Sequence, residues 1–503
     1  MKINQRKAGA GLTYIHMGIG FLVSLAFTPI MLRLLGQSEY GLYNLVASVV
    51  AYLGILNFGF GSAYVRYFSR YESQGDEEKI AKINGMFLLL FSFLGLLALV
   101  AGLILAQFSD LLFGAKLQAG EGVRAHWLMV ILVINLAFSF PSIVFTSHIT
   151  ARERFVFQGL VQLVKTLTSP FLILLALLLG YGSIGMALAV SLVNLVVELV
   201  FAGYCLGRLK MTFAFRGLDR GLMREITVFS SYIFINMVID QVNWNVDKFI
   251  IGRIRGTAPV AIYGVAATLH TTYQQVSMAI SNVFVPRVHQ IVASPGEDKE
   301  ELTRLFTRIG RLQFMILGFA ASVLIFFGKP FLLKWAGRAY GESYYVALLL
   351  ILPVTIPLIQ TLGIEIQRAK NMHQFRSWAY LFMALGNLLI SIPLTVRFGP
   401  VGAAAGTGLS MILGNGLIMN LYNHYKLGLD MGYFWKAIGR FIPALVLPIL
   451  SGILMVRFVD LNQLPLLIGM GLLYMVIFSL SFWFFGMNAY EKDLVRSPFR
   501  RRG

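Results

Sequence analysis

Apolar runs of about twenty residues recur along the whole 503-residue chain, and they constrain its fold more than any other feature. Each run is long enough to cross a bilayer as one α-helix, which satisfies its own backbone hydrogen bonds there. The mean hydropathy is +0.73, and only 13% of the residues are charged, which is not typical of a soluble globule. We therefore predict an all-α polytopic membrane protein with about fourteen transmembrane helices.

The spans are predicted from hydropathy to within two to four residues. They cover 9–34, 41–65, 83–106, 126–149, 155–180, 184–207, 226–251, 260–285, 312–328, 344–367, 375–396, 401–425, 434–456 and 464–486. Of the 42 Lys and Arg residues, 30 fall on the side that holds both termini, and 10 fall on the other side. Cytoplasmic loops carry this excess, so both termini are predicted to be cytoplasmic and the first span to be retained.

An internal repeat divides the chain. Arg33-Leu34-Leu35-Gly36 aligns with Arg253-Ile254-Arg255-Gly256 at an offset of 220, and Gly182 aligns with Gly399 at 217. A unit of six spans places both copies in the same orientation, as parallel repeats. We predict an N-terminal lobe at 1–215, a C-terminal lobe at 216–430, and two additional spans with a basic cytoplasmic tail at 431–503.

The seventh predicted span is unusually polar. Asn236, Asp240, Asn243 and Asp247 follow one another at i, i+4, i+7 and i+11, which is one helical face, and Lys248 adjoins them. Charges inside a membrane are costly unless they meet water or partners. The face is either a seam closed by neighbouring helices or the wall of a wet cavity. The first copy of the repeat lacks these carboxylates, which favours a function for Asp240 and Asp247, and we predict that Asp240 or Asp247 binds a coupling ion.

Other spans also carry ionisable side chains, and each has two interpretations. Lys165 and Glu198 lie at similar depths, so they either pair with each other or leave Lys165 as an anion ligand in a cavity. His16 is either a protonatable cavity residue or a hydrogen-bonded packing residue. Arg66 either extends to lipid headgroups or lies at the cytoplasmic mouth of a cavity.

The eighth and tenth spans add polar side chains in the second lobe. His270 and Gln274 share one stripe of span eight, and Gln275 lies on the adjacent stripe. Such a surface suits a ligand rich in hydroxyl groups. In span ten, Glu365 and Arg368 are three residues apart, which predicts a local ion pair.

Several motifs are absent from the sequence. It has no Walker A motif, no HExxH, no nucleophile elbow and no loop beyond roughly 25 residues. Cys205 is the single cysteine, which excludes an internal disulfide and a cysteine-based metal site. The sequence therefore predicts a protein that is not an enzyme and that has no metal or cofactor.

Certain motifs resemble a known family. They are Gly-Ser-Ala-Tyr-Val-Arg at 61–66, Asp-Lys-Phe-Ile-Ile-Gly at 247–252 and Ala-Ile-Tyr-Gly-Val-Ala at 261–266. With the two six-span lobes, they are similar to the polysaccharide transporter (Wzx-type) flippases of the MOP superfamily, which also contains lipid II flippases and MATE drug antiporters. The resemblance implies a V-shaped transporter of a bacterial plasma membrane that works by alternating access.

The resemblance also implies a cargo, an undecaprenyl-pyrophosphate-linked oligosaccharide moved to the outer leaflet for polysaccharide biosynthesis. Arg66, Lys165 and Lys248 would attract the pyrophosphate, whereas Asn236, Asn243, Gln274 and Gln275 would bond sugar hydroxyls. Transport would be coupled to an H⁺ or Na⁺ gradient or to the membrane potential, and the partners would include membrane lipids, a polymerase and glycosyltransferases. The alternatives are a lipid II-type flippase, a MATE-like drug exporter and a non-transporting scaffold.

Overall fold

The computed structural model describes residues 5–114, 116–216, 220–294, 299–370, 372 and 374–500. Within its helices, some side chains lie outside this description: those of residues 6, 7, 10, 220, 229, 232, 235, 236, 239, 240, 242–244 and 497–500. By internal packing the chain divides into two compact units, Met1–Gly264 and Val265–Gly503. The predicted lobes at 1–215 and 216–430 are a division by repeat rather than by packing, and they stay a prediction.

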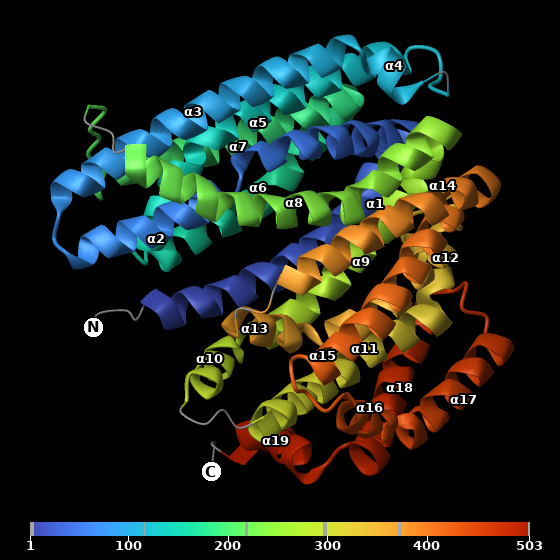
Figure 1. The fold of residues 1–503 in the computed structure, drawn as a ribbon. Coiled ribbons are helices and arrows are strands. Elements are labelled where there is room, and N and C mark those ends of the chain that lie inside the picture. The colour runs from blue at the N-terminus through green and yellow to red at the C-terminus, as the bar shows by residue number, and fades with distance from the viewer. Residues whose placement is uncertain are drawn as a thin grey trace. The chain divides into compact units, whose positions relative to one another are not determined.

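Unit 1 is built from helices only, in the ranges that the structure describes (Figure 1). Its elements are α1 (Gln5–Leu53), the 3₁₀ turn η1 (Gly54–Asn57), α2 (Phe60–Ser73), α3 (Glu77–Gln107), α4 (Ser109–Phe113), α5 (Glu121–Ala151), α6 (Phe155–Leu178), α7 (Gly182–Gly207), α8 (Arg220–Arg255) and the start of α9 (Thr257–Asn282). α5 packs along α3 and α7, and α6 packs between α1 and α7. This arrangement places α1, α5, α6 and α7 around one region.

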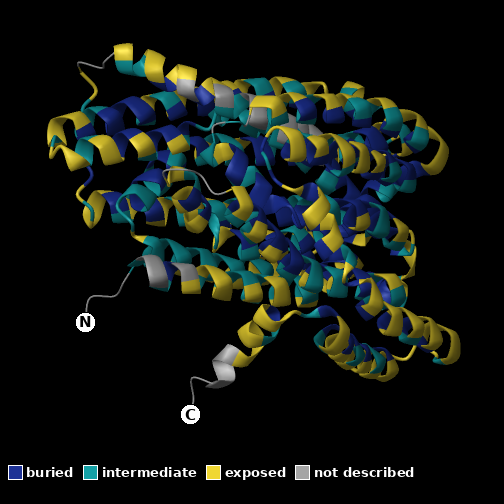
Figure 2. Cartoon of the chain, turned by 60° about the horizontal axis from the view of Figure 1, so that its bottom comes forward, coloured by how far each residue is buried: buried dark blue, intermediate teal, exposed yellow. Residues whose placement is uncertain are grey.

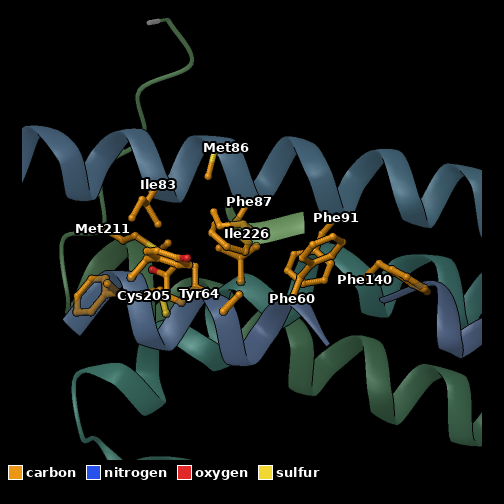
Figure 3. Close-up of a cluster of buried hydrophobic side chains, with 14 of the residues drawn as sticks. Phe60, Tyr64, Ile83, Met86, Phe87, Phe91, Phe140, Cys205, Met211 and Ile226 are labelled. Atoms are coloured by element: carbon orange, nitrogen blue, oxygen red, sulfur yellow. The ribbon is translucent and has the colours of Figure 1, made fainter. Parts of the chain in front are cut away.

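Aromatic side chains from α2 and α3 form the core of unit 1 (Figure 3). The Tyr64 ring meets Phe87 edge-on, with ring centroids 5.3 Å apart, and its hydroxyl donates to Asn84 Oδ1 at 2.6 Å. His148 Nδ1 lies 2.8 Å from the same hydroxyl. Because all three polar side chains are buried, their mutual hydrogen bonds offset the cost of removing them from water.

Unit 2 continues as a second set of helices after α9. Its elements are α10 (Val285–Ala293), α11 (Lys299–Trp335), η2 (Arg338–Tyr340), α12 (Ser343–Leu358), α13 (Thr361–Ala369), α14 (Gln374–Met411), the π-helical η3 (Ile412–Met419), α15 (Asn420–Tyr425), α16 (Met431–Gly439), α17 (Ile442–Phe458), α18 (Leu464–Ser481), the π-helical η4 (Phe482–Gly486) and α19 (Ala489–Arg500). α11 packs against α12, α16 and α18, so it is the helix around which this unit is assembled.

The aligned glycines of the repeat share an unusual backbone conformation. Gly36 has φ 76° and its counterpart Gly256 has φ 86°, while Gly182 has 54° and its counterpart Gly399 has 61°. These positive values are easy for glycine and costly for other residues. Two pairs at the same repeat positions with the same backbone requirement support the internal repeat.

Eight helices of the described chain are long and apolar enough to cross a membrane, or ten when each of two bent pairs is one span. The protein is therefore a multi-pass membrane protein. Two of the eight, Gly11–Ser73 and Gln374–Tyr425, each cover two predicted spans. Span ten and span thirteen are bent by 42° and 41°. The number fourteen is consistent with this arrangement and stays a prediction.

Figure 2 shows exposed residues along the outward faces of many helices. Large apolar side chains lie on these faces, among them Phe171, Leu389 and Phe458, which are 72%, 76% and 74% exposed. In a membrane protein such faces meet lipid, so the exposed apolar surface fits the membrane assignment.

Candidate functional site

The candidate site is a cavity of about 470 Å³ in unit 1, which we name the α5–α7 cavity. α1 contributes the apolar side of its lining with Ala47, Val50 and Ala51. α5, α6 and α7 contribute the polar side. The volume falls within the range of small-molecule binding sites.

Polar side chains reach the cavity at helical spacing from three helices. Those on α5 are Asn135, Ser139, Ser142 and Thr146, those on α6 are Gln162 and Lys165, and those on α7 are Asn194 and Glu198. Of these residues, Lys165 and Glu198 were predicted from the sequence, and those on α5 were not. Yet the α5 residues follow the i, i+4, i+7, i+11 pattern of span seven, so the signal was present in weaker side chains.

Lys165 and Glu198 face the same cavity from neighbouring helices. Lys165 is ten residues into α6, about 15 Å along the helix, and both side chains are half-buried. Although both belong to the described part of the chain, no ion pair joins them, and each still lies within electrostatic range of the other. Of the two interpretations of the sequence, the ion pair between Lys165 and Glu198 is therefore not formed in this structure. The Lys165 ammonium group faces the cavity.

Amide groups connect the helices around this pair. Asn194 Nδ2 donates to Asn135 Oδ1 at 3.4 Å, which links α7 to α5. Gln162 lines both the α5–α7 cavity and a second cavity of about 550 Å³. His16, Thr13 and Gln158 also line the second cavity. The two cavities are therefore neighbours that share one side chain.

His16 is both a cavity residue and a hydrogen-bonded one. Its Nε2 lies 2.8 Å from Thr166 Oγ1, which connects α1 to α6, and the ring lines the second cavity. The two interpretations of the sequence are therefore compatible in this structure. A role for His16 in transport stays a prediction.

The polar helix α8 is described only in part. The side chains of Asn236, Asp240 and Asn243 lie outside the described residues. Asp247 is 1% exposed and accepts a hydrogen bond from the Tyr263 hydroxyl at 2.5 Å. Lys248 is half-buried beside it. Packing within unit 1 thus accounts for the burial of Asp247, and its role in ion coupling stays a prediction.

Arg66 lies on α2 and is exposed, with its guanidinium 5.8 Å from the centre of the Tyr67 ring. It lines neither of the two cavities described above. The structure therefore does not bring Arg66 together with Lys165.

The polar stripe of α9 falls partly into the interior of unit 2. His270 is buried, Gln274 is half-buried and Gln275 is exposed. One and two turns further on, Ser277 and Ser281 accept hydrogen bonds from the buried Gln313 Nε2 at 2.9 and 2.8 Å. The C-terminal half of the stripe thus holds α9 to α11.

Glu365 and Arg368 form the ion pair that their spacing predicted, at 2.7 Å on α13. Arg368 is 61% exposed at its side chain, so the pair is a surface feature rather than a buried one. Such a pair contributes little to stability.

Chemically, the α5–α7 cavity can bind an anion next to a hydroxyl-rich group. An ammonium group attracts phosphate as a point charge and offers three donors. The surrounding amides and hydroxyls can both donate and accept hydrogen bonds, as sugar hydroxyls require. Ionisable side chains that face a cavity among membrane-spanning helices are typical of the substrate and ion pathways of membrane transporters.

The family follows from comparison with known proteins. Residues 7–292 match the model of a family described as polysaccharide biosynthesis proteins. This chain belongs to that family.

Two relatives extend the similarity along the chain. The membrane protein EpsK of Bacillus subtilis (strain 168) is 21% identical over 496 residues, which cover 96% of each chain. A Shigella flexneri protein named as an O-antigen transporter is 20% identical and covers 80% of this chain and 94% of its own.

Solved structures support the fold. The lipid II flippase MurJ, in an inward closed conformation, has a TM-score of 0.72 at 16% identity over 97% of this chain and 99% of its own. An inward-facing multidrug resistance MATE transporter of the MOP superfamily has a TM-score of 0.62 at 14% identity over 82% and 99%. The expected MATE- and lipid II flippase-like fold is confirmed.

Proposed function

We propose that this protein is a flippase that moves undecaprenyl-pyrophosphate-linked oligosaccharide repeat units from the inner to the outer leaflet of the bacterial plasma membrane. It works by alternating access, and both termini are cytoplasmic. The product serves capsule, exopolysaccharide or O-antigen-type polysaccharide biosynthesis. A H⁺ or Na⁺ gradient or the membrane potential drives the cycle, and the polymerase and glycosyltransferases of that biosynthesis are its partners.

One observation carries this proposal: Lys165 faces a cavity whose other polar lining consists mainly of amide and hydroxyl groups. The ammonium group suits the pyrophosphate, and the neutral polar side chains suit the sugars. Membership of the polysaccharide biosynthesis family and similarity to a protein named as an O-antigen transporter support the same cargo class.

A transport assay tests the proposal. The full chain is reconstituted in proteoliposomes with a fluorescent undecaprenyl-pyrophosphate oligosaccharide, and the fraction of label accessible from outside is followed over time. We expect Lys165→Gln to slow translocation by at least tenfold, because a charged hydrogen bond to phosphate contributes about 1.5–3 kcal/mol. Lys165→Arg keeps the charge and should retain most of the rate.

Lys116→Gln is the matched control, because Lys116 is an exposed lysine outside the cavity. The control should transport at the native rate. Native rates for Lys165→Gln would contradict the role of the cavity. If the native protein did not move the oligosaccharide but moved lipid II or exported a cationic drug, the proposed cargo would be wrong. One of the alternative cargoes would then take its place.

A further inference from the structure

The last helix, α19 (Ala489–Arg500), begins directly after the span formed by α18 and η4, which ends at Gly486. Its first turn is fixed in unit 2 by a buried ion pair. Arg311 Nε and Nη2 donate to the two oxygens of Glu491 at 2.7 and 3.0 Å, and the side chains are only 6% and 1% exposed. This bidentate geometry sets both the position and the rotation of the helix.

Further bonds hold the same turn. Arg311 Nη2 donates to the Gly486 carbonyl at 2.9 Å, and Nη1 donates to the carbonyl of Ala437. Asn488 and Glu491 exchange backbone-to-side-chain hydrogen bonds at 2.9 Å each, which is a capping box with asparagine at the N-cap. The start of α19 is therefore rigidly oriented.

One turn after Glu491, the same face of the helix becomes apolar and exposed. Leu494 and Val495 follow Glu491 at i+3 and i+4, and each is 45% exposed. α19 is 12 residues long, whereas a helix needs about 20 residues to cross a bilayer, so a transmembrane position does not account for their exposure. The face of α19 that carries the buried Glu491 therefore continues as an exposed apolar surface.

A cationic stripe runs beside this apolar face. Lys492 and Arg496 are four residues apart, and their charged groups lie 5.9 and 5.1 Å from the Trp483 ring centre. The sequence adds Arg500, Arg501 and Arg502, whose side chains lie outside the described residues. A basic amphipathic helix with an aromatic neighbour at a span end is typical of helices that lie in the headgroup region.

We propose that α19 is a binding surface for anionic phospholipid. Leu494 and Val495 enter the boundary between headgroups and acyl chains, and Lys492 and Arg496 contact the lipid phosphates. The buried Arg311–Glu491 pair holds the helix at the angle that this contact needs. This inference is independent of the cargo that the transporter moves.

A depth probe on α19 tests the proposal. Cys205 is the single native cysteine and is fully buried, so the full chain with Val495→Cys can be labelled selectively with bimane. The labelled protein in detergent is titrated with brominated phosphatidylglycerol or brominated phosphatidylcholine. We expect phosphatidylglycerol to quench the probe at a much lower mole fraction than phosphatidylcholine does.

The double variant Lys492→Gln/Arg496→Gln should raise the half-quenching fraction of phosphatidylglycerol roughly 30-fold, since each basic residue near a membrane contributes about a fivefold effect. Arg397→Gln/Arg457→Gln is the matched control, because it removes two exposed arginines elsewhere in unit 2. This control should behave as the unsubstituted labelled protein.

Two outcomes would overturn the proposal. Equal quenching by both lipids would show that the surface does not recognise anionic headgroups. If the bimane label became less accessible to solvent as the protein concentration rose, in the absence of lipid, a second copy of the chain would be covering the face.

Discussion

Lys165 and Glu198 line one cavity from adjacent helices without forming an ion pair, although both lie in the described part of the chain. An anion that enters the cavity is therefore attracted by the ammonium group and repelled by the carboxylate. Under the proposed function, Lys165 should therefore raise the affinity for a phosphate-bearing cargo, and Glu198 should lower it.

Neutralising the carboxylate should strengthen binding. For Glu198→Gln we expect the affinity for undecaprenyl pyrophosphate to rise roughly fivefold, because removing one like charge contributes about 1 kcal/mol at a partly solvated site. A titration of the purified protein measures this. Glu342→Gln, at an exposed glutamate of unit 2, should leave the affinity unchanged. Weaker binding by Glu198→Gln would show that the carboxylate assists rather than opposes the anion.

The buried pair of Arg311 and Glu491 makes a stability prediction. Glu491→Ala leaves a buried guanidinium without its counter-ion and should lower the free energy of unfolding by about 3–5 kcal/mol. Thermal denaturation in detergent would detect the loss. Arg304→Ala is the control, because its pair with Glu300 is exposed and should contribute less than about 1 kcal/mol. Equal effects of the two substitutions would contradict a structural role for the buried pair.

We expect Asp247 to contribute mainly to stability and Asp240 mainly to transport. Tyr263→Phe removes the hydrogen bond to the buried Asp247 carboxylate and should destabilise the protein by about 1–3 kcal/mol. Asp240→Asn should instead reduce transport with little change in Tm, as expected of a coupling residue. Full transport activity of Asp240→Asn would contradict the coupling hypothesis.

Gly36 tests the backbone requirement of the repeat. A Cβ at this position would meet no atom within 4 Å, so steric contact contributes nothing and only the φ of 76° matters. Gly36→Ala should therefore destabilise the protein by about 1–2 kcal/mol, measured as a fall in Tm. Gly18→Ala, which also has open space but lies in regular helix, should be neutral or stabilising. A neutral Gly36→Ala would contradict the conformational argument.

Much of the fold was predictable because membrane spans leave a direct mark on the sequence. Apolar runs predict the helices, and the offset of 220 aligns Gly36 with Gly256, which share a positive φ. The breaks within spans were less visible. Gly36, the non-helical residue inside α1, lies between the first two predicted spans, whereas span two itself is interrupted by η1 and by Phe58 and Gly59, both with positive φ. Helices tolerate such breaks where neighbouring helices satisfy the freed backbone groups.

The candidate site was predictable only in part. Lys165 and Glu198 were predictable because charges within spans are rare, whereas the neutral hydroxyls and amide of α5 give a weaker signal. Ser277 and Ser281 continue the predicted stripe of His270 and Gln274 at helical spacing, yet both accept hydrogen bonds from Gln313. The pairing of Arg311 with Glu491 joins residues 180 positions apart, which no local pattern can reveal.

The most direct test of the central claim is the Tm of the purified protein with three ligands in turn: an undecaprenyl-pyrophosphate oligosaccharide, lipid II and a cationic drug. A ligand at 100 times its Kd stabilises the folded state by about 2.7 kcal/mol. The proposed function predicts that the oligosaccharide raises Tm, and that Lys165→Gln reduces this effect. A rise with the drug alone, or one that is unchanged in Lys165→Gln, would contradict it.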